Sequence, residues 1–476
     1  MKSLNKKHTI WSTGAILLTC AIFVSCKISK DIAVPDAALP ANYISQGQAD
    51  TTSVGKLPWK EFFADEQLKQ LIADALEHNY DLQFALKNID AAALTLKQAK
   101  LGNIPTVDLL ATASSSRPSD NSLNGLSLSQ YLSTKHIEDY TLAVQISWEA
   151  DIWGKIRSQK AAALASFLNT QEAHKAIQTE LVNSVSKGYY NLLMLDDQMA
   201  IAKQNVLLND STLKMITLQY QSGQVTSLAV QQAQAQKLTA LELIPQFEKQ
   251  IAVQENAISI LCGHYPGEIK RDVNLNNILI SDKLEAGVPS DLLSRRPDVR
   301  QAELALSKAN ANVGYARANM YPSLTITAQG GLDAFKASNW FNIPASLFGT
   351  VIGGITQPLF QQKRLNTFYK VAQINRDQTV LQFRQSVLIA VEEVSDALVE
   401  MNKLKQQQFL AAERTNTLIV AAQNSQLLFK NGLANYLEVI TAQSNVLQSQ
   451  LQLAAVTKAQ LDASVDLYRS LGGGWN

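Results

Sequence analysis

The sequence has few of the residues that build metal sites and disulfides. Its 476 residues include three cysteines and five histidines. No HExxH or CxxC motif occurs, and the histidines stand far apart in the chain, so no metal site is predicted. The five histidines are His8, His78, His136, His174 and His264.

The sequence also has almost no net charge, and it lacks the motifs of common enzymes. It carries 42 basic and 41 acidic residues, which removes the electrostatic argument for binding nucleic acid. No Walker loop and no GxSxG elbow is present. We therefore expect a protein that is not an enzyme and binds no dissociable cofactor.

The N-terminus has the features of an export signal. Lysines precede an apolar run from Ile10 to Val24 that is too short for a permanent membrane helix. The run ends in "IFVSCK", which resembles the lipobox of bacterial lipoproteins. Residues 1–25 are thus predicted to be a signal peptide, and Cys26 to carry diacylglycerol and a fatty acyl chain such as palmitate. Lys27, where an Asp would favour the inner membrane, favours the outer membrane.

After Cys26 the chain lacks any apolar run of about 18 residues, so no spanning helix is predicted there. Cys20 would leave with the signal, which leaves Cys262 without a disulfide partner. Residues 26–58 are rich in turn-forming residues and are predicted to be a tether between the lipid and the fold.

Two parts of the chain repeat. "FKNGLANYLEVITAQ" at 429–443 resembles "YQSGQVTSLAVQQAQ" at 220–234, with Gly432 aligned on Gly223. Each glycine ends a long stretch with helical spacing. Residues 359–431 contain no Gly or Pro and would form a helix of about 110 Å, and 155–222 are interrupted only by Gly188. The repeat therefore predicts two very long, corresponding helices.

A second helical pattern follows each glycine, which predicts two helical hairpins capped by left-handed glycines. These patterns cover Gln224–Leu261, with an expected break at Pro245, and Leu433–Leu471. Together the patterns divide the mature chain into repeat 1 at 59–266, an inter-repeat segment at 267–289 and repeat 2 at 290–476.

Strands are predicted before each long helix. "YTLAVQISW" at 140–148 and "SLTITAQGG" at 323–331 alternate apolar and polar residues, which is typical of a sheet with one apolar and one wet face. Partner strands are expected at 106–113 and 347–357, and residues 114–130 are expected to be a loop. Aromatic residues flanking these strands could lie at membrane interfaces: Trp148, Trp153, Trp340 and Phe341.

Four strands cannot close a membrane barrel, and an open edge in lipid is costly. Two copies would give eight strands and an interior filled by side chains, whereas three would give twelve and leave room for water. Twelve long helices side by side would also enclose a lumen, so three copies fit better. A lipid-anchored coiled-coil scaffold that conducts nothing is the alternative from another class.

Six stretches carry a resemblance to the TolC/OprM-type outer-membrane efflux family, in its NodT-like lipoprotein branch. They are "LPWKEFFADEQLKQLIADALEHNYDLQFA" (57–85), "ISWEADIWGKIRSQKAA" (146–162), "GVPSDLLSRRPDVRQAELAL" (287–306), "ANMYPSLTITAQGG" (318–331), "ITQPLF" (355–360) and "NGLANYLEVITAQ" (431–443).

The resemblance implies a mainly α protein with membrane β-strands and two structural repeats. Four strands per chain would contribute to a trimeric 12-stranded barrel above a long periplasmic α-helical barrel. It implies an outer-membrane exit duct for small molecules such as drugs, working with a periplasmic adaptor protein and an inner-membrane pump of the RND class. A metal-ion or type I protein-secretion duct of the same fold is the alternative within this class.

The resemblance also places candidate residues at the hairpin tips, which form the periplasmic entrance in this family. The adaptor-facing candidates are Gly223, Thr226, Ser227, Leu228, Gly432, Asn435, Tyr436 and Leu437. Relatives narrow the entrance with a Leu and an Asp one turn later. Leu437 matches the Leu, but Thr441 stands where the acid would be, so Glu438 is the nearest candidate gate carboxylate. Gln232 is the counterpart of Thr441 in the first half.

The "SRRPDVRQAE" stretch is predicted to be structural. Pro297 and Asp298 suit the first turn of a helix. Arg295, Arg296 and Arg300 are expected to make structural contacts and not to bind a substrate.

Overall fold

The computed structural model describes residues 29–36, 39–40, 43, 53–131, 135–278 and 286–475. Cys26 lies outside these ranges, and so do parts of the predicted tether, namely 26–28, 37–38, 41–42 and 44–52. The described residues form two compact units. One contains 91–168, 304–381 and the described residues up to 35, and the other contains those within 36–90, 169–303 and 382–476. Each unit therefore takes residues from both predicted repeats.

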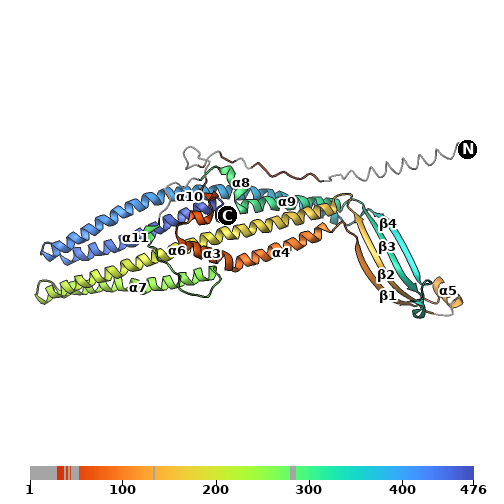
Figure 1. Ribbon diagram of the computed structural model, residues 1–476, viewed down its shortest axis with the longest axis horizontal. Coiled ribbons are helices and arrows are strands. Elements are labelled where there is room, and N and C mark those ends of the chain that lie inside the picture. The colour runs from red at the N-terminus through yellow and green to blue at the C-terminus, as the bar shows by residue number, and fades with distance from the viewer. Residues whose placement is uncertain are drawn as a thin grey trace. The chain divides into compact units, whose positions relative to one another are not determined.

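The first unit contains a four-stranded antiparallel sheet (Figure 1). Its strands, in spatial order, are β1 Thr106–Ser116, β2 Ile137–Ala150, β3 Ser323–Ala334 and β4 Leu347–Thr356. All four predicted strands are present, and the first three extend beyond the predicted bounds. The prediction of a loop at 114–130 is confirmed only for 117–122, because β1 continues to Ser116 and the short helix α5 Leu123–Tyr131 follows.

Two helices of equal length follow the strand pairs. α6 Lys155–Gln221 and α10 Arg364–Lys430 each have 67 residues. Each passes a glycine and a short turn and continues into a second helix, α7 Ser227–Leu261 or α11 Tyr436–Ser470, each of 35 residues. In the second unit the two hairpins lie side by side (Figure 1). This layout confirms the predicted two structural repeats.

The expected helix break at Pro245 was wrong, because α7 runs through it without interruption. A proline inside a helix loses one backbone hydrogen bond. Here the neighbouring turn is held by packing, since Phe247 is buried against the α6 residues Leu195 and Met199. Burial of a large apolar side chain contributes about 1.5–3 kcal/mol, which is of the same size as the cost of the proline.

Shorter elements complete the chain. α4 Tyr80–Lys100 precedes β1 and α9 Pro297–Ala318 precedes β3. The remaining elements are η1 Val54–Lys56, α2 Trp59–Phe62, α3 Glu66–His78, η2 Leu275–Asn277, η3 Pro289–Asp291, α8 Leu292–Arg295 and η4 Ala337–Asn339. Among the described helices, none combines the length and the apolar character needed to cross a bilayer.

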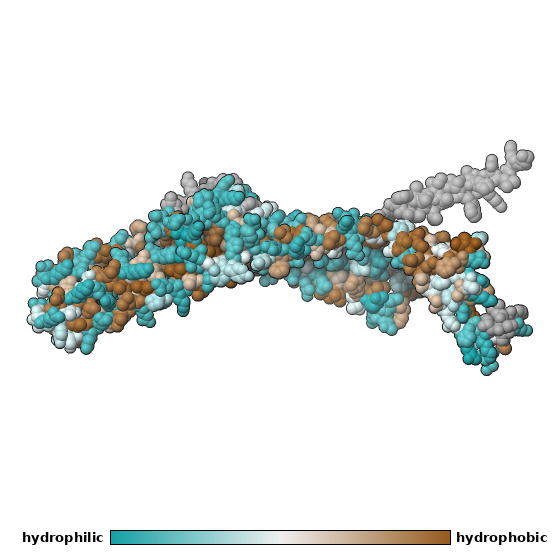
Figure 2. Space-filling view, turned by 60° about the horizontal axis from the view of Figure 1, so that its bottom comes forward, coloured by the Kyte–Doolittle hydropathy of each residue, from teal (hydrophilic) through white to brown (hydrophobic). Residues whose placement is uncertain are grey.

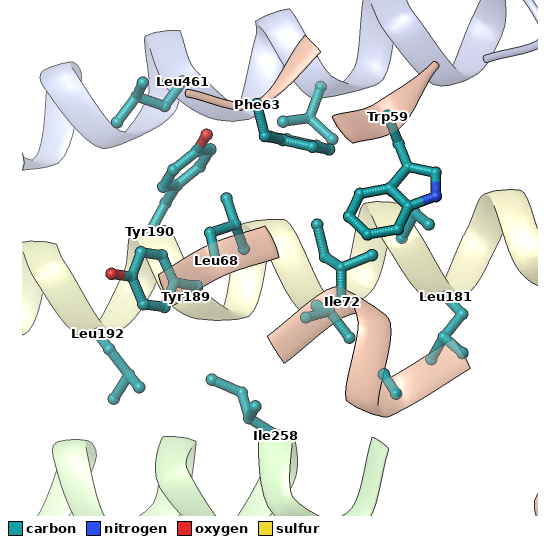
Figure 3. Close-up of a cluster of buried hydrophobic side chains, with 14 of the residues drawn as sticks. Trp59, Phe63, Leu68, Ile72, Leu181, Tyr189, Tyr190, Leu192, Ile258 and Leu461 are labelled. Atoms are coloured by element: carbon teal, nitrogen blue, oxygen red, sulfur yellow. The ribbon is translucent and has the colours of Figure 1, made fainter. Parts of the chain in front are cut away.

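The largest apolar core lies in the second unit, where α2 and α3 pack on the long helices (Figure 3). Leu68 and Ile72 of α3 contact a layer formed by Tyr189 of α6, Ile258 of α7 and Leu461 of α11, and all five are almost completely buried. Asp65 caps α3 by accepting from the N–H groups of its first turn. α3 thus ties three of the long hairpin helices together.

A second core follows one face of α10. Val387, Val394 and Leu398 are buried, and Val391 and Met401 pack beside them. The 4,3 spacing of these residues places them on one helix face, as expected for helices packed side by side.

Candidate functional site

The two hairpin tips have the same backbone geometry. Gly223 and Gly432 are left-handed, with φ of 76° and 73°. After each glycine the next N–H donates to the carbonyl five residues earlier, Gln224 to Gln219 and Leu433 to Leu428, both at 2.8 Å. The glycine N–H groups donate to the carbonyls three residues earlier. This pattern is the Schellman motif, so both long helices end in the same turn.

The start of the second helix differs between the tips. Asn435 caps α11: its Oδ1 accepts from the N–H of Glu438 at 3.1 Å, and its Nδ2 donates to Glu438 Oε1 at 3.0 Å. Thr226, the corresponding residue before α7, makes no side-chain cap bond. The candidate gate carboxylate of Glu438 therefore also belongs to a helix cap.

An apolar cluster holds the two tips together. Ile216 of α6 and Ala229 of α7 are completely buried against Phe429 of α10 and Val439 of α11. Because all four helices contribute, the two turns are fixed relative to each other within this unit.

The predicted tip residues are presented to solvent in the single chain. Leu228 and Leu437 keep 54% and 53% of their surface exposed, although both are large apolar residues. Gly223, Thr226, Ser227, Gly432, Asn435, Glu438 and Thr441 are also exposed, and Tyr436 is half-buried. Gln232, the counterpart of Thr441, is half-buried and its Oε1 has no partner among the described residues. The structure thus gathers the predicted residues at one end of the hairpins.

Ion pairs hold α6 to its neighbours near and below the tips. Lys237 of α7 lies 2.6 Å from Asp210 of α6, and Lys214 lies 2.8 Å from the same carboxylate. Hydrogen bonds from these two lysines lower the pKa of Asp210 to about 2. Farther from the tip along α6, Lys187 pairs with Asp466 of α11 at 2.6 Å. Lys214 is four residues from Asp210 on α6 itself, whereas sequence spacing gave no signal for the Lys237–Asp210 and Lys187–Asp466 pairs, because their partners lie on different helices.

One face of the sheet is apolar across all four strands. The strand registers bring Val107 of β1 beside Ile146 of β2, Ile146 beside Ala328 of β3, and Ala328 beside Val351 of β4. The same register gives the rest of this face: Leu109, Ala111, Ala113, Tyr140, Leu142, Val144, Trp148, Ala150, Leu324, Ile326, Gly330, Leu332, Ala334, Leu347, Gly349, Gly353 and Ile355. Glu138 of β2, which pairs with Ser115 of β1 near one end of the sheet, is the one charged residue that these registers place on it, and hydrophobic residues gather on the sheet in Figure 2.

The opposite face is mostly polar. It presents Thr106, Asp108, Thr112, Thr141, Gln145, Ser147, Glu149, Thr325, Thr327, Gln329, Asp333 and Thr350, with a few apolar residues among them.

The apolar face is exposed in the single chain: on β4, Val351 is 76% exposed and Ile355 is 74% exposed. Among the described residues no layer covers the apolar face, so its side chains do not form a packed core.

The sheet has two unpaired edges. β1 pairs only with β2, and β4 pairs only with β3, in the ranges that the structure describes. A strand edge presents a row of unpaired N–H and C=O groups that can pair with another chain. The sheet is thus open on both sides.

The arginines of "SRRPDVRQAE" make structural contacts, as predicted. Arg296 is 4% exposed, and its guanidinium binds Asp298 at 2.6 and 3.0 Å, Glu393 at 2.7 Å and the carbonyl of Ser470 at 3.2 Å. Burial opposes the charge, but these acidic partners raise the pKa of Arg296. Arg295 donates to the carbonyl of Gly55, and Arg300 pairs with Glu303. This cluster ties the start of α9 to α10 and α11.

A sequence model described as outer membrane efflux protein matches residues 71–264 and 288–473. The two matched segments cover most of the chain and correspond to its two halves. The chain belongs to the outer membrane efflux protein family.

Two relatives of this outer membrane efflux protein are similar to it in sequence over most of the chain. The solvent efflux pump outer membrane protein SrpC of Pseudomonas putida is 30% identical over 468 residues, which cover 95% of this chain and 96% of SrpC. The cation efflux system protein CusC of Escherichia coli O6:H1 is 28% identical over 418 residues, 88% of each chain. The efflux protein is thus an outer-membrane component of an efflux system.

A solved structure supports the fold of the efflux protein. The open state of the Neisseria gonorrhoeae MtrE outer membrane channel superimposes with a TM-score of 0.84, covers 95% of this chain and 99% of MtrE, and is 23% identical. The fold is therefore that of the outer-membrane efflux channels, as the sequence predicted.

Proposed function

We propose that three copies of this chain form the exit duct of a tripartite efflux pump, through which small molecules pass passively to the cell exterior. The main support for this proposal is the sheet: one face is apolar across four strands, the other is mostly polar, and both edges are open among the described residues. This is the arrangement of a barrel segment whose outside faces lipid and whose inside faces water.

Closure of the sheet requires further copies. Unpaired edge groups in a bilayer cost several kcal/mol each, so β1 of one copy is proposed to pair with β4 of the next. Three copies give twelve strands and a water-filled interior, whereas two give eight strands and an interior filled by side chains. The four hairpin helices of each copy would form the wall of the periplasmic tube.

The hairpin tips are proposed to receive a periplasmic adaptor protein, which links the duct to an inner-membrane pump of the RND class. Both tips present the same Schellman turn with an exposed Leu, Leu228 or Leu437, nearby. Three copies would thus offer six similar turns to the adaptor. Leu437, Glu438 and Thr441 are proposed to narrow the entrance, with Glu438 supplying the charge.

The cargo is proposed to be small organic molecules, because SrpC is named for solvent efflux. CusC is named for cation efflux, so metal ions are the second candidate. We further propose that Cys26 is acylated and anchors the chain in the outer membrane, and that the chain catalyses no reaction. The energy for transport would come from the inner-membrane pump.

The test is to extract the protein from membranes, measure its native mass and record its conductance in a planar bilayer. The expected result is a trimer with a stable, water-filled conductance. A monomer that passes no current would instead support a lipid-anchored scaffold. For the anchor, Cys26→Ala should abolish incorporation of labelled fatty acid while the trimer still forms, and unchanged labelling would refute the acylation site.

A further inference from the structure

Three metal-ligating side chains meet in the second unit, away from the hairpin tips. Asp74 and His78 lie one turn apart on α3, and His264 lies in the turn that follows α7. Their ligand atoms all lie within 4.8 Å of one another. The sequence did not indicate this group, because His264 is 190 positions from Asp74.

The carboxylate of Asp74 lies between the two imidazoles. Its Oδ1 is 2.9 Å from Nδ1 of His78, and its Oδ2 is 2.8 Å from Nε2 of His264. The two rings are 5.2 Å apart between centroids. The three side chains keep 35%, 45% and 52% of their surface exposed, so an ion can reach them from solvent.

Two imidazole nitrogens and one carboxylate oxygen are a ligand set typical of zinc. Zinc takes such ligands at about 2.0–2.2 Å, which places tetrahedral ligand atoms about 3.3 Å from one another. Each imidazole nitrogen lies 2.8–2.9 Å from a different oxygen of Asp74, and one ligand atom from each of the three residues lies within 4.8 Å of the others, so side-chain rotations would bring three ligand atoms to this spacing. A fourth position would remain for water.

The backbone around the three side chains is held firmly. Nδ2 of the buried Asn79, next to His78, donates to the carbonyl of Leu261 at 2.9 Å. Gly263, next to His264, has a φ of 72°, and a Cβ there would lie 2.4 Å from the carbonyl oxygen of His78. Only glycine allows the two chain segments to approach this closely. The ligands are thus presented by a fixed framework, which metal sites need.

The second half of the chain has the same framework without the two histidines, and Asp291 stands there at the position that corresponds to Asp74. There Gly472 has a φ of 82° and contacts the backbone of Arg295 as Gly263 contacts that of His78. The positions that correspond to His78 and His264 hold Arg295 and Gly473. The close contact is therefore general to both halves, and the two histidines are an addition in the first.

We propose that Asp74, His78 and His264 bind one divalent transition-metal ion per chain, with zinc as the best match. Imidazole and carboxylate ligands also suit nickel and copper, so the class of ion is defined by this ligand set. A bound ion would join the end of α3 to the end of α7. The site does not depend on the proposed duct and would exist in a single folded chain.

The test uses the full-length, detergent-extracted protein prepared without a polyhistidine tag. Equilibrium dialysis against zinc is expected to give one ion per chain at micromolar zinc. His78→Gln and His264→Gln should each weaken binding at least about tenfold, because each removes one of three protein ligands. X-ray absorption at the zinc edge should show two imidazole ligands.

His136→Gln and His174→Gln are the matched controls, since they remove histidines outside the group. Both should bind zinc as the natural chain does. Zinc should also raise the unfolding temperature of the natural chain and not that of the His78→Gln/His264→Gln double variant. Equal zinc binding by the double variant, with its native mass and circular dichroism unchanged, would overturn the proposal, and so would a natural chain that binds no zinc. Conductance, measured in parallel, reports on the duct alone.

Discussion

Asn79 and Arg296 make the same contact in the two halves of the chain. Asn79 Nδ2 donates to the carbonyl of Leu261, the last residue of α7, and Arg296 Nη1 donates to the carbonyl of Ser470, the last residue of α11. Carbonyls at helix ends lack intrahelical partners, so each side chain satisfies one of them. The repeat thus preserves a function of the side chain while the residue type changes.

The first prediction concerns Arg296. Arg296→Ala should destabilise the protein by about 1.5–3 kcal/mol, because it removes the buried guanidinium that bonds Asp298 and the carbonyl of Ser470, while Glu393 keeps Arg469 at 3.5 Å. Arg300→Ala, which removes a more exposed pair with Glu303, should cost at most about 1 kcal/mol. Thermal unfolding followed by circular dichroism measures both. Equal losses would show that Arg296 is not the structural centre of this cluster.

A second prediction compares the two helix caps at the hairpin tips. Asn435→Ala should cost about 1 kcal/mol, because Asn435 bonds the N–H of Glu438. Thr226→Ala, at the corresponding position, should cost less, because Thr226 makes no side-chain cap bond. Hydrogen exchange of the first turns of α11 and α7 would detect the difference locally. Faster exchange in α7 than in α11 after the respective substitutions would contradict it.

The sequence predicted the long helices, the four strands and the tips because these depend on local patterns. Alternation and 3.6-residue spacing are read directly from neighbours in the chain. The helix at Leu123–Tyr131 was missed because its residues are mostly small and polar and resemble a loop. The helix break predicted at Pro245 was wrong because the packing of Phe247 against α6 supports the helix there. The group of Asp74, His78 and His264 could not be predicted from the sequence, because only the fold brings His264 close to α3.

A third prediction tests the two faces of the sheet. Val351→Arg places a charge on the apolar face, which should cost up to about 2–4 kcal/mol in the bilayer and reduce the yield of assembled protein in the outer membrane. Thr350→Arg, one residue away on the polar face, should assemble normally and alter only the ion selectivity of the conductance. Membrane fractionation and bilayer recording distinguish them. If Thr350→Arg failed to assemble and Val351→Arg assembled normally, the lipid-facing and water-facing sides of the sheet would be the reverse of those proposed.

A fourth prediction separates backbone strain from crowding at two left-handed glycines. Gly223→Ala should cost about 1–2 kcal/mol, because the position is left-handed but open, with nothing within 4 Å of an added Cβ. Gly472→Ala should cost clearly more, because the Cβ would also lie 2.9 Å from the backbone of Arg295. Unfolding temperatures of the two variants give the comparison. A smaller loss for Gly472→Ala would show that the C-terminal turn yields easily.

The last prediction concerns the pH dependence due to Asp462 on α11. Burial raises the pKa of this carboxyl above its ordinary value, although Lys458 lies beside it, and its Oδ1 has no partner among the described residues. A carboxyl whose folded pKa is raised disfavours folding when ionised, and this penalty disappears as the pH falls through that pKa. Asp462→Asn, which resembles the protonated form, should therefore raise the unfolding temperature at pH 7. The gain should shrink in acid, where the natural Asp462 is itself protonated.

Asp466→Asn is the matched control one turn away: it breaks the 2.6 Å pair with Lys187 and should lower the unfolding temperature at pH 7. A loss of stability at pH 7 in Asp462→Asn would mean that its pairing with Lys458 outweighs the cost of burying its charge.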